Sequence, residues 1–338
     1  MEYLGDANQV NVQCSKPIMN SVQRHSVFRS QLLDWYEHNR RDLPWRENND
    51  PYRVWLSEIM LQQTRVAAVT QHYGKFLLRF PTIKKLASAR ESSVLAAWSG
   101  LGYYRRARML HAAAKEIVKK YGGKFPQSAD ELRALPGIGR YTAAAIASIA
   151  FDEPIAVVNG NVERVIERLA GERLPEKELW QTAQELLSPS RPGDFNQAMM
   201  ELGATVCLPR EPMCLACPVH GMCATRGELK RTAKSTRQKK EVHFALDCHD
   251  GTVFLVERPR HASLMPGMWE LPQIAGQNGT AEAWLTLRHS ITVTDYLVHV
   301  ARCPAPHGIT GSRISQQRVA KLALTGLARK ILRAANVI

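Results

Sequence analysis

Four cysteines in the middle of the chain constrain its fold more than any other feature. They are spaced as Cys207-x6-Cys214-x2-Cys217-x5-Cys223 and stand among three prolines. Four thiolates from so short a segment can converge on one point, and ligation by cysteine alone suits an iron–sulfur cluster or a structural zinc ion. The 6-2-5 spacing is unlike the paired C-x2-C motifs of zinc ribbons. The alternatives are four unrelated buried cysteines or disulfides, although nothing else marks the chain as secreted.

The charge balance indicates a polyanionic partner. The chain has 338 residues, a formal net charge of +14, 45% hydrophobic residues and 22% charged residues. This composition predicts a globular protein with room for two domains. Nucleic acid is the usual partner of so basic a chain, and a merely soluble basic protein is the alternative. No apolar run is long enough to span a bilayer and the N-terminus lacks the regions of a signal peptide. We therefore expect no membrane association and a cytoplasmic location.

Periodicity divides the chain into a tail and two domains. Residues 1–24 predict a flexible N-terminal tail, and residues 25–226 carry apolar residues at helical spacing with few strand-like runs. Residues 227–240 are basic and poor in apolar residues, which predicts a linker. Residues 241–338 mix strand-like runs with a helical C-terminal segment. The predicted fold is multidomain, with an all-α domain followed by an α+β domain.

A glycine turn between two expected helices predicts contact with a phosphate. The segment at 135–143 reads LPGIGRYTA, in which Gly137 and Gly139 allow the backbone to approach a phosphate. The helix that follows offers its unpaired N–H groups to the same ligand. This is the pattern of a helix-hairpin-helix element, which holds DNA without reading its sequence. An ordinary link between two helices is the alternative.

Together the motifs resemble the MutY-type adenine DNA glycosylases of the helix-hairpin-helix superfamily, from about residue 27 to residue 223. Further motifs that carry the resemblance are LPWR at 43–46, SEIMLQQTRV at 57–66, GLGYYRRAR at 100–108 and NGNVERV at 159–165. The resemblance implies a [4Fe–4S] cluster on the four cysteines and a Nudix-like second domain. It also implies a monomer that binds double-stranded DNA containing A:8-oxoguanine or A:G mispairs.

Glu58 is the predicted catalytic acid. Adenine leaves deoxyribose poorly unless a ring nitrogen is protonated, and Glu58 stands beside an Ile-Met-Leu run. Burial there would raise its pKa and keep a proton available at neutral pH. The resemblance gives Glu58 the role of acid to adenine N7 and later of base for water. A surface or capping glutamate is the alternative.

Tyr141 indicates the type of reaction. The lyases of the superfamily carry a lysine at this point, which forms a Schiff base with the sugar. Tyrosine offers no amine, so we expect base excision without strand cleavage, and the resemblance places Tyr141 and Glu201 in the substrate pocket. Gln63 and Tyr103 match residues that wedge into the duplex when the adenosine is flipped out, with ordinary packing as the alternative. The predicted substrate- and DNA-binding residues are Arg46, Leu61, Gln63, Thr64, Tyr103, Gly137, Gly139, Glu201, Ser290 and Thr292.

Asn159 departs from the family pattern, which has Asp-Gly-Asn-Val where this chain has Asn159-Gly160-Asn161-Val162. The expected aspartate stabilises the oxocarbenium ion, as the second carboxylate does in glycoside hydrolysis. Asparagine keeps the shape and loses the charge, and its amide oxygen would recover only part of the stabilisation. We still count Asn159 among the catalytic residues, either as a tolerated substitute or as the mark of a weakened enzyme.

The second domain predicts lesion recognition rather than hydrolysis. Residues 253–273 resemble the Nudix-like domain of the family, but the segment after Gly276 holds only Glu282, where a Nudix hydrolase needs clustered glutamates for Mg²⁺. In RHSITVT at 288–294, Thr292 stands at the serine of the family's Phe-Ser-His loop and the histidine is absent. Ser290 is a nearby polar substitute, and a plain strand is the alternative.

The leading interpretation is therefore a monofunctional adenine DNA glycosylase of base excision repair. A catalytically impaired lesion-binding protein is the second hypothesis, and Asn159 favours it. Tyr141 argues against a bifunctional lyase, and the missing acidic residues argue against a Nudix hydrolase.

Overall fold

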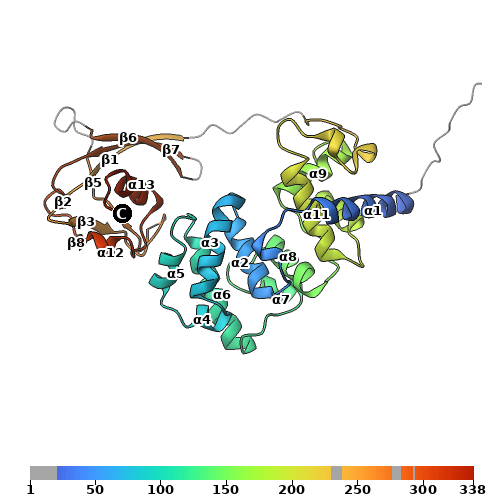
Figure 1. The fold of residues 1–338 in the computed structure, drawn as a ribbon, viewed down its shortest axis with the longest axis horizontal. Helices are drawn as coiled ribbons and strands as arrows, with labels where there is room; N and C mark the ends of the chain where they lie inside the picture. Colours follow the sequence, from blue (N-terminus) through green and yellow to red (C-terminus); the bar gives the residue numbers. More distant parts are fainter. Residues whose placement is uncertain (1–20, 230–237, 263, 276–282, 292–293) are drawn as a thin grey trace, which may run out of the picture.

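The computed structural model describes residues 21–229, 238–262, 264–275, 283–291 and 294–338. A helical domain runs from blue through yellow in Figure 1, and a domain of sheets and two helices follows in orange and red. In residues 21–229 every regular element is a helix, which confirms the predicted all-α domain. None of the described helices has the length and apolar character needed to cross a bilayer.

The predicted domain limits differ slightly from the helix and strand limits. The first helix already begins at Ser21, inside the predicted tail, and the first strand begins at Gln238, inside the predicted linker. Residues 1–20 and 230–237 lie outside the described part. The helices of the first domain are α1 Ser21–Asn39, α2 Pro51–Leu61, α3 Val66–Arg79, α4 Ile83–Ala87, α5 Glu91–Ala97, α6 Arg105–Tyr121, α7 Ala129–Arg133, α8 Arg140–Phe151, α9 Gly160–Ala170, α10 Glu176–Leu186 and α11 Pro192–Thr205. Short 3-10 helices are η1 Pro44–Arg46, η2 Cys214–Ala216 and η3 His220–Met222.

The helical domain has two hydrophobic cores. The larger core is formed by the helices from α2 through α8, around the fully buried side chains of Trp55, Phe76 and Trp98. The smaller core joins α1 to α9, α10 and α11, so the first helix packs with the end of the domain. Helix α8 lies between the cores and contacts both α2 and α11. Four of its alanines are fully buried, because small side chains let neighbouring helices approach closely: Ala143, Ala144, Ala145 and Ala147.

Helix α2 brings a glutamate into the interior. It begins with Asp50 as its N-cap, whose carboxylate accepts from the Arg53 backbone N–H, and with Pro51 in its first turn. From Tyr52 to Met60 all side chains but one are buried. A helix that is apolar on nearly every face must be surrounded, and Glu58 is carried inward with the rest.

The second domain combines two small sheets with two helices. The strands are β1 Gln238–Ala245, β2 Cys248–His249, β3 Thr252–Glu257, β4 Trp269–Glu270, β5 Gln273–Ile274, β6 Leu285–Ile291, β7 Thr294–Ala301 and β8 Ser312–Ser315. One sheet has the order β5-β1-β7-β6, and the other has β3 between β2 and β4 with β8 also paired to β3. The helices are α12 Gln316–Val319 and α13 Gly326–Ala334, and α13 packs on the core that the sheets share. This confirms the predicted mixture of helices and sheets.

The paired ends of β6 and β7, around Ser290 and Asp295, form what we call the β6–β7 tip. The two strands are antiparallel, with Ser290 opposite Asp295 and Ile291 opposite Thr294. Strand β7 also runs parallel to β1, with Val298 beside Val242. The side chains of Met268 and Ala323 are buried in the larger core of the helical domain, so the two domains share part of one core.

Candidate active site

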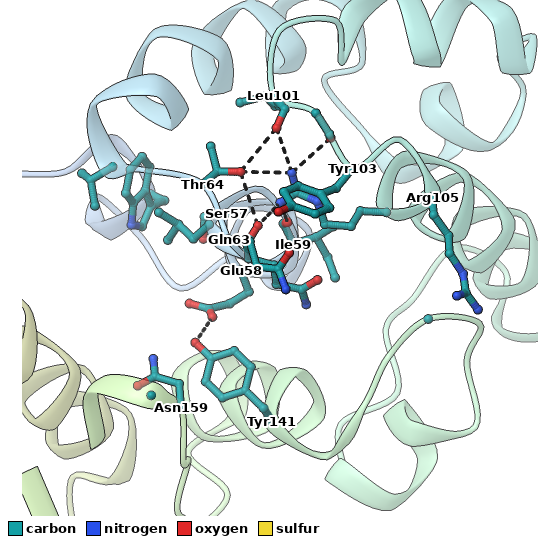
Figure 2. A pocket seen from close by; sticks show the side chains of 18 of the residues that line it. Ser57, Glu58, Ile59, Gln63, Thr64, Leu101, Tyr103, Arg105, Tyr141 and Asn159 are labelled. Carbon is teal, nitrogen blue, oxygen red and sulfur yellow. Dashed lines mark hydrogen bonds between the residues drawn. The ribbon is translucent and has the colours of Figure 1, made fainter. Parts of the chain in front are cut away.

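A cavity of about 1840 Å³ is lined by residues of both domains. Its walls come from α2, from the turns around Gln63 and Tyr103, from the starts of α8 and α9, and from α11. The second domain contributes residues 264–266 and 289–291. Both domains therefore line the same cavity, and Figure 2 shows the side chains that reach it from the helical domain.

Glu58 is buried at one wall of this cavity, with 6% of its surface exposed. The Tyr141 hydroxyl donates a hydrogen bond to the Glu58 carboxyl (Figure 2). Burial raises the pKa of Glu58, and this effect exceeds the lowering by the Tyr141 hydrogen bond and by the Arg46 charge. The carboxyl therefore stays protonated to a higher pH than an ordinary glutamate, as its apolar sequence neighbours predicted.

Tyr141 stays neutral beside this acid. Burial raises the pKa of its hydroxyl well above the ordinary value, the Glu58 charge raises it further, and a hydrogen bond with the Asn159 side chain lowers it. The hydroxyl also lies 3.3 Å from the Met200 sulfur. Tyr141 therefore acts as a fixed hydrogen-bond donor that orients Glu58, with no amine for Schiff-base chemistry.

Asn159 is the N-cap of α9. Its Oδ1 accepts from the backbone N–H groups of Asn161 at 2.9 Å and Val162 at 3.0 Å. The amide oxygen is thus committed to the helix N-terminus, and the NH₂ group is the part that faces Tyr141. The capping bonds hold this oxygen at the start of α9, and its partial replacement of an aspartate stays a prediction.

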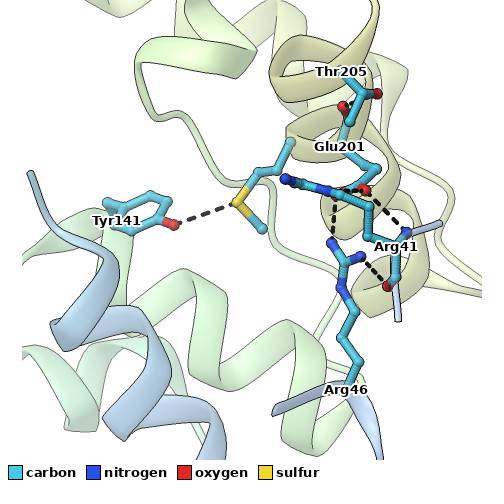
Figure 3. A network of polar contacts seen from close by, with 6 residues as sticks. Arg41, Arg46, Tyr141, Glu201 and Thr205 are labelled. Atoms are coloured by element: carbon cyan, nitrogen blue, oxygen red, sulfur yellow. Dashed lines mark hydrogen bonds and ion pairs between the residues drawn. The ribbon is translucent and has the colours of Figure 1, made fainter. Parts of the chain in front are cut away.

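A second carboxylate in the cavity is held by two arginines (Figure 3). Both oxygens of Glu201 are engaged, since Arg41 donates to Oε1 at 2.6 Å and Oε2 at 2.9 Å and Arg46 donates to Oε2 at 2.8 Å. The Glu201 side chain is 1% exposed. Burial acts to raise its pKa, but the arginine hydrogen bonds and charges lower it to about 2. Glu201 is therefore a permanent anion, whereas Glu58 is an acid.

The two arginines of this network differ in exposure, since the Arg41 side chain is 37% exposed and that of Arg46 is mostly buried. The Arg46 side chain is 12% exposed and also donates to the Arg41 backbone carbonyl. Arg46 was predicted as a DNA-binding residue, and the structure shows it fixing Glu201 inside the cavity wall. Arg41 was missed, although it stands two positions before the LPWR motif.

The two predicted wedge residues occupy strained turns. Gln63 has φ +55° and Tyr103 has φ +47°, a backbone region that residues other than glycine rarely adopt. Tyr103 is 44% exposed, and both side chains line the cavity together with Leu61 and Thr64. Because strain of this kind persists only where the surroundings impose it, the two turns must be held from behind. We call residues 62–64 and residues 99–103 the first and second wedge loops.

Arg106, which the sequence did not single out, ties the two wedge loops together. Its guanidinium donates to the carbonyls at 59, 60 and 62 and to the Thr64 hydroxyl, and also to the carbonyls of Leu101 and Gly102 at 3.1 and 3.2 Å. Burial lowers the pKa of Arg106 to about 10, which still leaves the group charged at neutral pH. The end of α2, which carries Glu58, is thus fixed to both loops.

The glycine turn joins α7 to α8, as predicted. Gly137 has φ +74°, and a Cβ there would lie 2.4 Å from the Cβ of Met109. Gly137 is therefore required both by its backbone conformation and by close packing. Gly139 is the N-cap of α8 in extended conformation, with open space where a side chain would stand. The helix N-terminus behind it is thus left accessible.

The second domain brings its β6–β7 tip to the cavity. His289, Ser290 and Ile291 line it, and the Ser290 hydroxyl donates to the Asp295 carboxylate at 2.5 Å. Burial and then the Lys330 charge lower the pKa of His289. Thr292 lies outside the described residues, so its predicted role stays a prediction.

The four predicted ligand cysteines are half-buried free thiols, which rules out disulfides among them. Burial, together with the charges of the other three cysteines nearby, raises the pKa of Cys217 to about 11. Within the described residues no three His, Cys, Asp or Glu side chains are arranged for a single metal ion. A donor set of four cysteines is chemically suited to an iron–sulfur cluster.

A buried arginine lies against this cysteine group. Arg168 donates from one nitrogen to the Cys207 sulfur at 3.3 Å and to the Leu208 carbonyl at 2.7 Å. Its own carbonyl accepts from the Cys223 thiol at 3.2 Å. Arg168 thus places a positive charge within hydrogen-bond distance of the cysteine group.

The fold and the site together define a helix-hairpin-helix DNA glycosylase. The model of the HhH-GPD superfamily base excision DNA repair proteins matches residues 56–189. A solved thermostable thymine-DNA glycosylase superposes with a TM-score of 0.57 at 32% identity, covering 61% of this chain and 97% of that one. An endonuclease III–DNA complex superposes with a TM-score of 0.54 at 23% identity, covering 62% and 97%, and it shows the shared fold alone.

Curated relatives define the family within this class. The adenine DNA glycosylase of Mus musculus is 42% identical over 74% of this chain and 54% of its own length. That of Buchnera aphidicola subsp. Acyrthosiphon pisum is 38% identical over 68% of this chain and 69% of its own length. The chain therefore belongs to the MutY-type adenine DNA glycosylase family, and it spans about half the length of the mammalian members it matches.

Proposed function

We propose that the chain removes adenine from duplex DNA in which adenine is mispaired with 8-oxoguanine or guanine. The bond broken is the N-glycosidic bond, and the sugar–phosphate backbone stays intact because Tyr141 supplies no amine. The observation that carries this proposal is the buried carboxyl of Glu58, whose pKa is raised, in a cavity walled by two strained wedge loops. The similarity to adenine DNA glycosylases supports the same substrate base.

The reaction begins with an adenosine turned out of the stack into the cavity. Tyr103 and Gln63 fill the space that it leaves, which offsets the few kcal/mol that unstacking costs. Glu58 donates its proton to adenine N7, so the base departs as a neutral molecule. The resulting Glu58 carboxylate then accepts a proton from the water that attacks the sugar carbon, which restores the acid.

Asn159, next to Tyr141, does little to stabilise the cation formed on the sugar. Asn159 is neutral and its oxygen faces the helix N-terminus, so it adds no negative charge at that position. This observation favours a second candidate function, a lesion-binding protein with slow excision. The two candidates differ in rate rather than in substrate.

We also propose that Cys207, Cys214, Cys217 and Cys223 hold a [4Fe–4S] cluster. Such a cluster would supply a fixed structural centre next to α9, and the excision scheme needs no electron transfer. Iron and sulfide in a brown preparation, with an absorption band that disappears on oxidation, would support it. A colourless preparation that contains one zinc ion per chain would contradict it.

For the partner, we propose that a monomer binds the duplex in the cavity, with the β6–β7 tip beside the base opposite adenine. The net charge of +14 predicts binding that falls steeply with salt. Discrimination of 8-oxoguanine from guanine would rest on Ser290 and on residues 292–293, which lie outside the described part.

The experiment is excision from duplexes that differ only in the mispair. Purified protein is mixed in excess with A:8-oxoguanine, A:G, A:T and T:G duplexes, and the products are analysed with and without alkali. Adenine release from the first two, with strand breaks only after alkali, supports the proposal. Release of thymine, or breaks without alkali, would contradict it. Full binding of A:8-oxoguanine without adenine release favours the second candidate.

A further inference from the structure

The second wedge loop is held from behind by the second domain. The Tyr104 hydroxyl, at the end of this loop, donates to the Leu324 carbonyl at 2.8 Å and is buried. The Ser99 hydroxyl, at its start, accepts from the Arg329 guanidinium at 2.5 Å. The two hydroxyls lie 3.1 Å apart, so they form one polar link between the domains. Both ends of the loop that presents Tyr103 thus contact the second domain, one through Leu324 and the other through Arg329 of α13.

The same helix reaches the strand that leads to the β6–β7 tip. Lys330, next to Arg329 in α13, donates to the Arg288 carbonyl of β6 at 3.3 Å. His289 and Ser290, the next residues of β6, line the cavity. Helix α13 therefore contacts the support of the second wedge loop on one side and the cavity-facing strand on the other.

Stability alone does not explain Arg329. The residue is half-buried, its Nε is buried without a hydrogen-bond partner among the described residues, and burial lowers its pKa. Burying a guanidinium costs hydration free energy, and one hydrogen bond to a neutral hydroxyl recovers less than this cost. A hydrophobic side chain of similar length would be at least as stable in this place.

We propose that Arg329 is a positioning residue that couples contact of the β6–β7 tip with the opposite base to insertion of Tyr103 into the duplex. The coupling rests on the proposed function and adds a specificity-determining residue to it. Because coupling is reciprocal, contact of the tip with the opposite base favours insertion of Tyr103 by the same free energy as insertion favours that contact. Losing the link removes this mutual effect and leaves each contact intact.

The test measures base unstacking by fluorescence, without bond cleavage. 2-Aminopurine replaces adenine opposite either 8-oxoguanine or a tetrahydrofuran abasic analogue, and its fluorescence rises when it leaves the stack. In Arg329→Met we expect the rate of this rise opposite 8-oxoguanine to fall about tenfold, to that seen opposite the abasic analogue. Opposite the abasic analogue the rate stays unchanged, since no base is present to couple.

Two further variants make the test specific. Ser99→Ala removes the acceptor, so the double variant should be no slower than either single variant. Arg333→Met removes the same charge from an exposed site of α13 and should behave as the unmodified protein. The melting temperature of Arg329→Met should stay equal or rise, because a costly buried cation is gone.

Three results would overturn the inference. Equal slowing opposite both partners would make Arg329 a general structural residue, and an unchanged rate opposite 8-oxoguanine would remove its role. Absence of any unstacking by the unmodified protein would remove the wedge itself. A protein that unstacks 2-aminopurine but releases no adenine would contradict the proposed function only, and the coupling would still be measured.

Discussion

Replacing Asn159 with aspartate should restore a negative charge beside the reacting sugar. The new carboxylate would keep both capping bonds, to the N–H groups of Asn161 and Val162, through one oxygen. Its other oxygen would replace the NH₂ group that faces Tyr141. Aspartate is as good an N-cap as asparagine and interacts favourably with the positive end of α9, so the fold should be unaffected or slightly stabilised.

The size of the effect follows from Coulomb's law. Opposite unit charges about 4 Å apart attract by about 4 kcal/mol at an effective dielectric constant of about 20. A transition state stabilised by that amount forms roughly a thousandfold faster. The capping bonds draw part of the charge toward the helix N-terminus, so we expect a gain of roughly ten- to a thousandfold.

The assay is single-turnover adenine excision from an A:8-oxoguanine duplex, with binding measured separately. Asn159→Asp should excise faster while its affinity for the lesion stays within a few fold. Asn48→Asp, an exposed site outside the cavity lining, adds the same charge and should leave the rate unchanged. An equal or lower rate for Asn159→Asp would mean that the Asn159 amide itself supports excision, and it would refute the electrostatic reasoning.

The remaining predictions concern the supports of the site. Arg106→Lys loses the forked donor that joins the wedge loops and should slow 2-aminopurine unstacking at least tenfold. An unchanged rate would mean that Arg106 is not needed to hold the loops. Gly203→Ala would place a Cβ 2.7 Å from the Cβ of Asn161 and should lower stability by about 1–3 kcal/mol and slow excision. Gly74→Ala, with open space in α3, should instead stabilise by about 0.5–1 kcal/mol; thermal unfolding compares the two.

The sequence was informative wherever local composition decides the outcome. Apolar neighbours on α2 predicted a buried Glu58 with a raised pKa. The turn at Gly137 followed from the glycine spacing. In each case the cause lies within a few positions along the chain, so periodicity and residue type are sufficient.

Contacts between distant segments were not predictable. Arg46 and Glu201 are 155 positions apart, and nothing in the sequence predicted their ion pair. Arg106 bonds to carbonyls more than forty positions away, and Arg329 reaches Ser99 across 230 positions. Arginine is common in basic chains, and nothing near these positions distinguishes a phosphate ligand from a buried support.

Asn159 illustrates a third limit. Its departure from the family pattern was visible in the sequence, but the direction of its amide was not. Only the start of α9 determines that, because two backbone N–H groups need an acceptor and the oxygen alone can serve them. The chemical meaning of the substitution thus depends on a helix terminus rather than on residue type.

The central claim is that Glu58 delivers the proton on which adenine departs, and the most direct test is the pH dependence of single-turnover excision. Only the acid form donates, so the rate should be constant below the raised pKa of Glu58 and fall as pH rises through it. Glu58→Gln keeps the shape without the proton and should lose excision at every pH while it still binds the mispair. Substantial excision by Glu58→Gln, or a rate that increases with pH through this range, would contradict the account.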